Sequence, residues 1–187
     1  MARSRLQSDV LRSALHATAD ALDYHSEIEL LLVGGAAGML TGLLSPARTT
    51  HDCDVMVYAP PQAWHAVETA ARLAARKLHL GSSWLNSDAQ LLHRRLPVAW
   101  KSRRITVGRF GSRAAGLLVH AIGRPDFIAM KFIAGRVQDR EDLASLRITA
   151  AEAAFVRDYL STLASRGEHP DHIANAADLL NAMNPPA

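Results

Sequence analysis

Two aspartates one residue apart, Asp52 and Asp54, are the residues of this chain best suited to chemistry. The period-2 alternation of a strand would place both carboxylates on one face and direct Cys53, Val55 and Val57 into the core. Two neighbouring carboxylates repel each other unless a cation lies between them, and hard oxygen ligands suit Mg²⁺ or Mn²⁺. We therefore expect a metal site at this pair.

A second pattern lies just upstream of the aspartates. The apolar run at 28–33 predicts a strand, and Gly34 and Gly35 follow it as a tight turn before a helix of small residues. Glycines at such a turn let a phosphate approach backbone N–H groups, where the start of a helix favours negative charge. Singly, Gly-Gly is most often a plain turn and Asp-x-Asp a solvated strand end. The two in this order, with Arg48 and Thr50 just before the first aspartate, are more specific.

Together these residues resemble the signature of the DNA polymerase beta-type nucleotidyltransferase superfamily. The segment from Met130 to Leu146 is similar to the second signature of its minimal bacterial branch, which contains AbiEii-type toxins. The resemblance covers roughly residues 28–146. Its matching elements are Val33-Gly34-Gly35, then Arg48-x-Thr50-x-Asp52-x-Asp54-Val55, and Trp84-Leu85-Asn86, which also occurs in small uncharacterised members of the branch.

The resemblance implies a role for each matched residue in binding an NTP and a metal ion. Asp52 and Asp54 would hold Mg²⁺ or Mn²⁺, and Lys131 would reach the phosphates. If it does, Lys131→Ala should weaken NTP binding by about 1.5–3 kcal/mol and leave the melting temperature without NTP nearly unchanged. The remaining roles are Gly34 and Gly35 for the phosphates, Arg48 and Thr50 to brace the strand or the nucleotide, and Asp139 or Asp142 to orient Lys131 and Arg136 or to complete the site.

One element of the family pattern is missing from this sequence. Many members carry a third carboxylate on a later strand, but no Asp or Glu occurs between Asp88 and Asp126. Either Asp88, Asp139 or Asp142 substitutes for it, or metal binding is weakened to one ion, or nucleotide affinity persists without turnover. Structural alternatives also stand: Asp139 as a helix N-cap with Asp142 as its partner, and Lys131 as a surface lysine with its ammonium in water.

Composition limits the class of protein. The chain has 187 residues, of which 49% are hydrophobic, enough for a compact core. It has no apolar run of about 18 residues and no signal peptide, so we expect a soluble, cytoplasmic protein without a membrane partner. Cys53 is the only cysteine, which excludes an internal disulfide. Residues 89–125 carry eight Lys and Arg and no Asp or Glu. This block is either a solvated basic face or a surface that would attract NTP or RNA.

The predicted elements make an α/β (α+β) nucleotidyltransferase fold, a short mixed sheet of about five strands flanked by helices. We expect a nucleotidyltransferase-like domain over residues 1–146 and a C-terminal helical extension over 147–187, packed on the same domain. Trp84 lies in a polar loop, either as an anchor, which we favour, or as a base-stacking platform. Further strands are expected at 96–100, 104–110 and 117–122, and helices at 4–24, 62–77, from Arg124, 149–165 and from Pro170.

Two functions follow from this interpretation. The first is a metal-dependent enzyme that transfers NMP from an NTP to a hydroxyl of RNA, with tRNA favoured, or of protein. Such an enzyme could be the toxin of a toxin–antitoxin pair with a cognate antitoxin. The second is a nucleotide- or RNA-binding module on a catalytically degenerate form of the same fold, and the missing third carboxylate supports it.

Overall fold

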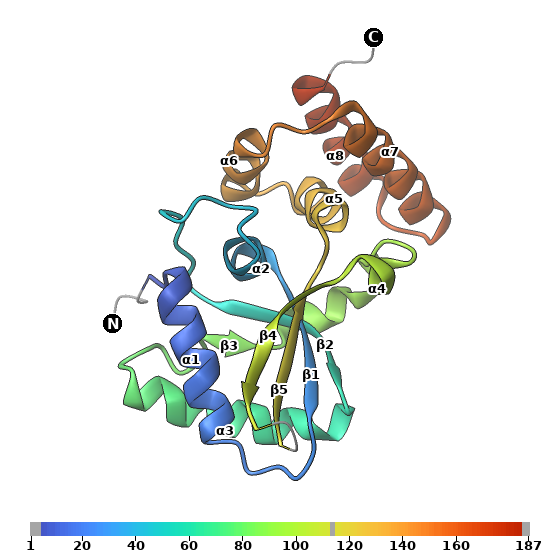
Figure 1. Ribbon diagram of the computed structural model, residues 1–187. Coiled ribbons are helices and arrows are strands. Elements are labelled where there is room, and N and C mark those ends of the chain that lie inside the picture. The colour runs from blue at the N-terminus through green and yellow to red at the C-terminus, as the bar shows by residue number, and fades with distance from the viewer. Residues whose placement is uncertain (1–4, 113–114, 185–187) are drawn as a thin grey trace. The chain divides into compact units, whose positions relative to one another are not determined.

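The computed structural model describes residues 5–112 and 115–184 (Figure 1). The chain divides into two compact units. The first, the sheet unit, comprises Met1–Arg94 and Arg104–Ile122, and the second, the helical unit, comprises Arg95–Arg103 and Gly123–Ala187. The boundaries between these units do not fall at residue 146. The domain boundary expected at residue 146 stays a prediction.

The sheet unit is built on a mixed sheet whose five strands, within the described residues, run in the order β3-β2-β1-β5-β4. The central strand β1 is antiparallel to β2 and parallel to β5, while β2 and β3 are parallel and β4 and β5 are antiparallel. This confirms the predicted α+β fold class, a mixed sheet flanked by helices. The strands are β1 (Ile28–Val33), β2 (Cys53–Ala59), β3 (Leu85–Asn86), β4 (Ile105–Gly111) and β5 (Gly116–Ala121).

Helices cover one face of this sheet because their apolar stripes match it. Helix α1 (Ser8–Asp20) packs against α3 (Trp64–Lys77) and against β4 and β5 (Figure 1). The buried side of α1 includes Leu11 and Leu15, and alanines fill the buried side of α3, so the two helices can approach closely. The short helix α2 (Gly34–Leu40) follows β1 directly and contacts β1 and β2. Both long helices were predicted, although α1 is shorter than the expected 4–24.

A β-bulge in β2 corrects the expectation that Val57 points into the core. Cys53 and Val55 are fully buried, as expected, but Val57 is only half-buried. The pairing with β1 shifts register there: Leu32 pairs with Val55, whereas Leu31 pairs with Val57, which leaves one extra residue in β2. An extra residue reverses the alternation of side chains beyond it, so Val57 lies on the face of Asp54.

The prediction of a strand at 96–100 is wrong. The chain forms a 3₁₀ helix, η2 (Asp88–Arg95), and then a short helix, α4 (Trp100–Arg103). Pro97 cannot donate to a sheet ladder, and Ala99 has a φ of 59°, which an extended strand does not permit. The fifth strand is instead β3, in the segment that looked like a loop.

The Trp84 side chain just before β3 is the anchor that we favoured. It is 1% exposed. Its indole Nε1 donates to the Ala71 carbonyl of α3, over 3.1 Å. A ring held in this way has no free face for a nucleobase.

The helical unit consists of helices that begin at predicted signals. Pro125 and Pro170 stand in the first turns of their helices, and Thr149 and Glu152 form the expected capping box. Helix α5 packs against α6, α7 and α8, and α7 packs against α8, so these helices form a small bundle. Their bounds are α5 (Arg124–Ala134), α6 (Val137–Ser145), α7 (Ala150–Ser165) and α8 (Pro170–Met183).

Candidate active site

Gly34 and the second aspartate come together in the sheet unit, where the two glycines expected in a turn are the first residues of α2. Val33 at the end of β1 pairs with Asp54 in β2, so the residue after Val33 lies beside the aspartate. Gly34 has a φ of +66°, which disfavours any side chain, and a Cβ atom there would be 3.1 Å from Asp54 Oδ2. The absence of a side chain at Gly34 therefore leaves the Asp54 carboxylate close to the backbone of Gly34.

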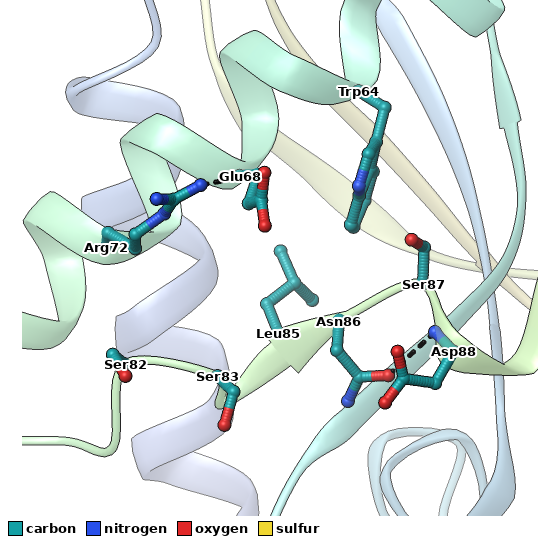
Figure 2. Close-up of a pocket in the computed structure, with 9 residues that line it drawn as sticks. All are labelled: Trp64, Glu68, Arg72, Ser82, Ser83, Leu85, Asn86, Ser87 and Asp88. Atoms are coloured by element: carbon teal, nitrogen blue, oxygen red, sulfur yellow. Dashed lines mark hydrogen bonds and ion pairs between the residues drawn. The ribbon is translucent and has the colours of Figure 1, made fainter.

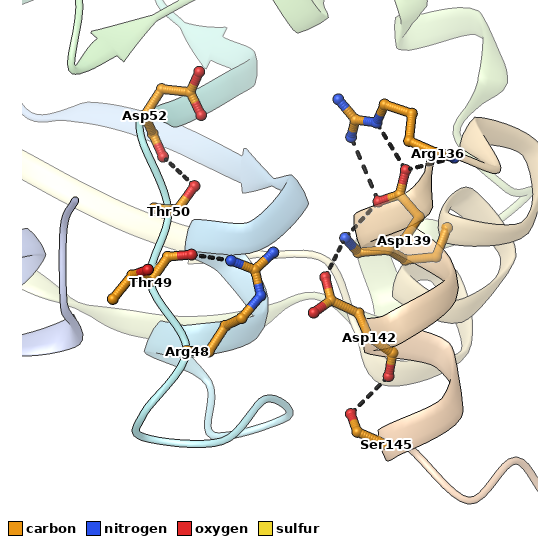
Figure 3. A network of polar contacts seen from close by, with 9 residues as sticks. Arg48, Thr49, Thr50, Asp52, Arg136, Asp139, Asp142 and Ser145 are labelled. Atoms are coloured by element: carbon orange, nitrogen blue, oxygen red, sulfur yellow. Dashed lines mark hydrogen bonds and ion pairs between the residues drawn. The ribbon is translucent and has the colours of Figure 1, made fainter. Parts of the chain in front are cut away.

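Gly35 makes the same close approach to the segment that precedes the aspartates. A Cβ atom at Gly35 would be 3.2 Å from Thr50 Oγ1 and 3.7 Å from a terminal nitrogen of Arg48. The Arg48 guanidinium also donates to the Thr49 carbonyl (Figure 3). The sheet unit thus brings Gly34, Gly35, Arg48 and Thr50 to one end of β1 and β2. Their expected roles toward a nucleotide stay predictions.

The first aspartate is held through its backbone. Asp52 immediately precedes β2, and the Thr50 hydroxyl donates to the Asp52 carbonyl over 3.1 Å (Figure 3). Thr50 is in turn fixed by Leu6, because the two residues exchange backbone hydrogen bonds of 2.7 and 3.0 Å. Sequence reasoning missed this bridge, since Leu6 was assigned to the first helix. The N-terminal segment therefore anchors the loop that carries Asp52.

The donor set at the aspartates is suited to a hard cation. Cys53 lies between them but is fully buried on the opposite face, and burial together with Asp54 and Asp52 raises the pKa of its thiol far above the ordinary value. A thiol that stays protonated is no metal ligand, so the two carboxylates offer oxygen ligands alone. Mg²⁺ commonly takes one or two carboxylates and completes its shell with water and substrate phosphates. The pair therefore fits Mg²⁺ or Mn²⁺.

The described residues hold no cluster of acids that would complete this pair. Within residues 5–112 and 115–184, no three His, Cys, Asp or Glu side chains form a group that could hold a metal ion. Of the residues named as substitutes for a third carboxylate, Asp88 belongs to the sheet unit, whereas Asp139 and Asp142 belong to the helical unit.

Asp88 lines a polar cavity of about 320 Å³ between α3 and β3 (Figure 2). It opens the 3₁₀ helix η2, and its backbone N–H donates to Asn86 Oδ1 over 3.0 Å. Leu85 points toward Trp64 of α3, whereas the Asn86 amide points to the other side of the strand (Figure 2). Sequence reasoning gave Asn86 no role, although Asn86 belongs to the Trp84-Leu85-Asn86 element of the resemblance.

The second-signature residues form an ion network inside the helical unit. Lys131 is 4% exposed, and its Nζ donates to Asp139 Oδ1 over 2.6 Å and to Asp142 Oδ2 over 2.7 Å. Arg136 Nε donates to Asp139 Oδ2 over 2.7 Å. Burial by itself raises the pKa of Asp139, but the hydrogen bonds from Arg136 and Lys131 outweigh it and hold the pKa below its ordinary value. The Asp139 carboxylate is therefore ionised, and the Lys131 side chain lies between it and Asp142.

This geometry corrects two of the structural alternatives. Lys131 is not a surface lysine, because its ammonium is buried. Asp139 is not the N-cap of α6: Arg136 holds that position, and Asp139 is the third residue of the helix, accepting from the Arg136 backbone N–H over 3.2 Å. Lys131 belongs to the helical unit and Gly34 to the sheet unit, and the expected approach of the two stays a prediction.

The basic block at 89–125 is largely neutralised by acids from outside it. Arg113 lies outside the described residues. Five arginines of this block form ion pairs with acidic residues of their own unit. Because of these pairs, the free positive charge of the block is smaller than the sequence suggests. The pairs are Arg95 with Glu168, Arg103 with Asp126, Arg104 with Glu29, Arg109 with Glu27 and Arg124 with Glu152.

The mixed sheet with a Gly-Gly turn beside an Asp-x-Asp strand is that of a nucleotidyltransferase-like fold. Residues 11–161 match the family described as nucleotidyltransferase of unknown function, DUF6036, and the chain belongs to this family. Comparison with curated proteins and with solved structures yields no match. In the described part of the chain, no helix is long and apolar enough to cross a membrane.

Proposed function

We propose that this protein is a metal-dependent enzyme that transfers NMP from an NTP to a hydroxyl group. The observation that carries the proposal is the 3.1 Å approach between Asp54 Oδ2 and the position of a Gly34 side chain. It means that a phosphate held at the Gly34 backbone would lie within reach of an ion held by Asp52 and Asp54. Triphosphate and metal would then share one site, as nucleotidyl transfer requires.

The chemistry is a displacement at the α-phosphorus of the NTP. The acceptor oxygen forms a bond to this phosphorus, the bond to the oxygen that bridges to the β-phosphate breaks, and pyrophosphate leaves while the hydroxyl proton passes to water. The bound metal ion would supply neutralisation of the phosphate charge. Asp52 and Asp54 would hold that ion, Gly34 and Gly35 would let the phosphates approach the backbone, and Thr50 would fix the carbonyl of Asp52.

The acceptor and the cellular role are finer parts of this proposal. RNA, and tRNA in particular, is our first choice of acceptor, with a protein hydroxyl second. The basic segment 89–125 supports an RNA acceptor, because positive charge attracts the phosphate backbone. The ion pairs of its arginines reduce the free charge that is left for this attraction. The resemblance to the AbiEii branch supports a toxin with a cognate antitoxin. A gene for a small regulator beside this one would strengthen that role.

The fate of a radioactive label tests the proposal. The protein is incubated with total tRNA, Mg²⁺ or Mn²⁺, and each NTP labelled at either the α- or the γ-phosphate. Nucleotidyl transfer moves the α-label into RNA or protein and leaves the γ-label in pyrophosphate. Transfer of the γ-label would instead show a phosphotransferase and would refute the proposed chemistry.

A binding module on the same fold is the second candidate, and one observation favours it. The described residues contain no third acidic ligand beside Asp52 and Asp54. Saturable NTP binding without transfer of the α-label, under either metal and with RNA or protein offered as acceptor, would establish the module in place of the enzyme.

A further inference from the structure

The strand beside the aspartates presents one polar side chain to the same site. Strands β2 and β3 are parallel, with Cys53 opposite Leu85 and Asp54 opposite Asn86. Neighbouring strands lie about 4.8 Å apart and paired residues share a face. Burial agrees with this: Cys53 and Leu85 are 0% and 3% exposed, whereas Asp54 and Asn86 are both half-buried. Asn86 is thus the direct neighbour of Asp54 on the face that carries the aspartate.

The orientation of the Asn86 amide is fixed by the turn that follows β3. Its Oδ1 accepts the backbone N–H of Asp88 over 3.0 Å (Figure 2). This bond occupies the oxygen side of the amide and decides which end of the group is the donor. The NH₂ group is therefore the end that remains to meet a ligand. A donor at this position suits an anionic oxygen, and phosphate oxygens are the anions expected beside Asp54.

We propose that Asn86 is a nucleotide-binding residue that donates from its side-chain amide to the triphosphate of the substrate. The inference rests on the proposed function, because it takes the ligand at Asp54 to be a metal-bound NTP. A neutral donor here adds affinity for phosphate without adding a third negative charge.

The position of Asn86 also offers a physical reason for the lack of a third carboxylate in this chain. A carboxylate at residue 86 would strengthen metal binding and repel the triphosphate, whereas an amide does neither. The wild-type site should therefore hold metal weakly without nucleotide and more tightly in the presence of NTP.

Two substitutions test the role of Asn86, and a third is their control. Asn86→Asp keeps the acceptor for the Asp88 N–H but replaces the donor with negative charge, and Asn86→Ala removes both. Ser83→Asp adds the same charge at an exposed position before β3. Mn²⁺ affinity without nucleotide is measured by electron paramagnetic resonance, and NTP affinity in EDTA by equilibrium binding, with circular dichroism as the check on folding.

Asn86→Asp should bind Mn²⁺ on the order of tenfold more tightly than wild type, because a third carboxylate lies beside the ion. The same variant should bind metal-free NTP at least about tenfold more weakly, and Asn86→Ala should also lose about tenfold, the value of a hydrogen bond to a charged group. Ser83→Asp should change neither affinity by more than about twofold.

Equal behaviour of Asn86→Asp and Ser83→Asp in both measurements would overturn the inference. Asp54→Asn separates this failure from failure of the proposed function. If Asp54→Asn loses Mn²⁺ binding while both Asn86 variants behave as wild type, the site stands and only the role of Asn86 is overturned. If the wild-type chain binds neither Mn²⁺ nor NTP, both proposals are overturned.

Discussion

Replacing Lys131 by methionine should destabilise the protein strongly, although the side chain keeps its length. The ammonium is buried and lies 2.6 and 2.7 Å from carboxylate oxygens of Asp139 and Asp142, which are 1% and 4% exposed. Removing one partner from a buried ion network leaves charge without compensation and typically costs about 3–5 kcal/mol. Arg136 still pairs with Asp139, which places our expectation near the lower end, about 3 kcal/mol.

The loss is measured as the free energy of unfolding in urea, followed by circular dichroism. Lys101→Met is the matched control, because Lys101 is exposed in the same unit and its loss should cost less than about 0.5 kcal/mol. Adding Asp139→Asn and Asp142→Asn to Lys131→Met should recover more than half of the loss, since a neutral cluster needs no cation. A Lys131→Met variant within 1 kcal/mol of wild type would refute this reasoning and restore the expectation of an unchanged melting temperature.

Two further predictions concern other parts of the chain. Gly34→Ala should cost about 1–2 kcal/mol of stability, because alanine is strained at the positive φ of this position. It should also abolish NTP binding, because the new methyl group meets Asp54. Calorimetric titration with NTP would detect any binding that survives and so contradict the prediction. Hydrogen bonds from His172 and Arg95 lower the pKa of Glu168 from 4.5 to about 2, so the stability that this carboxylate contributes is present above pH 4.5 and is lost as the pH falls toward 2. Urea unfolding between pH 5 and pH 3 should therefore lose less stability in Glu168→Gln than in wild type, and equal losses would contradict the assignment.

Local patterns in the sequence were enough to predict most elements of the fold. Apolar runs, alternation and turn residues identified β1, β2, β4 and β5. Prolines identified the starts of α5 and α8, and a capping box identified the start of α7. Each of these signals lies within a few residues of the element it predicts. The approach of Gly34 to Asp54 follows from the pairing of the two strands that carry these motifs, and the two strands are consecutive along the chain.

The features that were missed depend on contacts between distant residues. The bulge that turns Val57 to the face of Asp54 arises from the register between two strands, and no pattern within β2 alone shows it. Strand β3 has only two residues, too few for alternation to be visible, and its pairing is what places Asn86 beside Asp54. The burial of Lys131 likewise follows from carboxylates on the next helix, α6.

Release of pyrophosphate by matched variants tests the central claim most directly. Wild-type protein, Asp54→Asn and Ser83→Asn are each incubated with Mg²⁺, the four NTPs and tRNA, and pyrophosphate is counted against NMP joined to the acceptor. We predict equal amounts of the two products from wild type and Ser83→Asn, none when EDTA removes the metal, and none from Asp54→Asn although it folds normally. Undiminished pyrophosphate release by folded Asp54→Asn, or release that persists in EDTA, would contradict a metal-dependent nucleotidyl transfer at the aspartate pair.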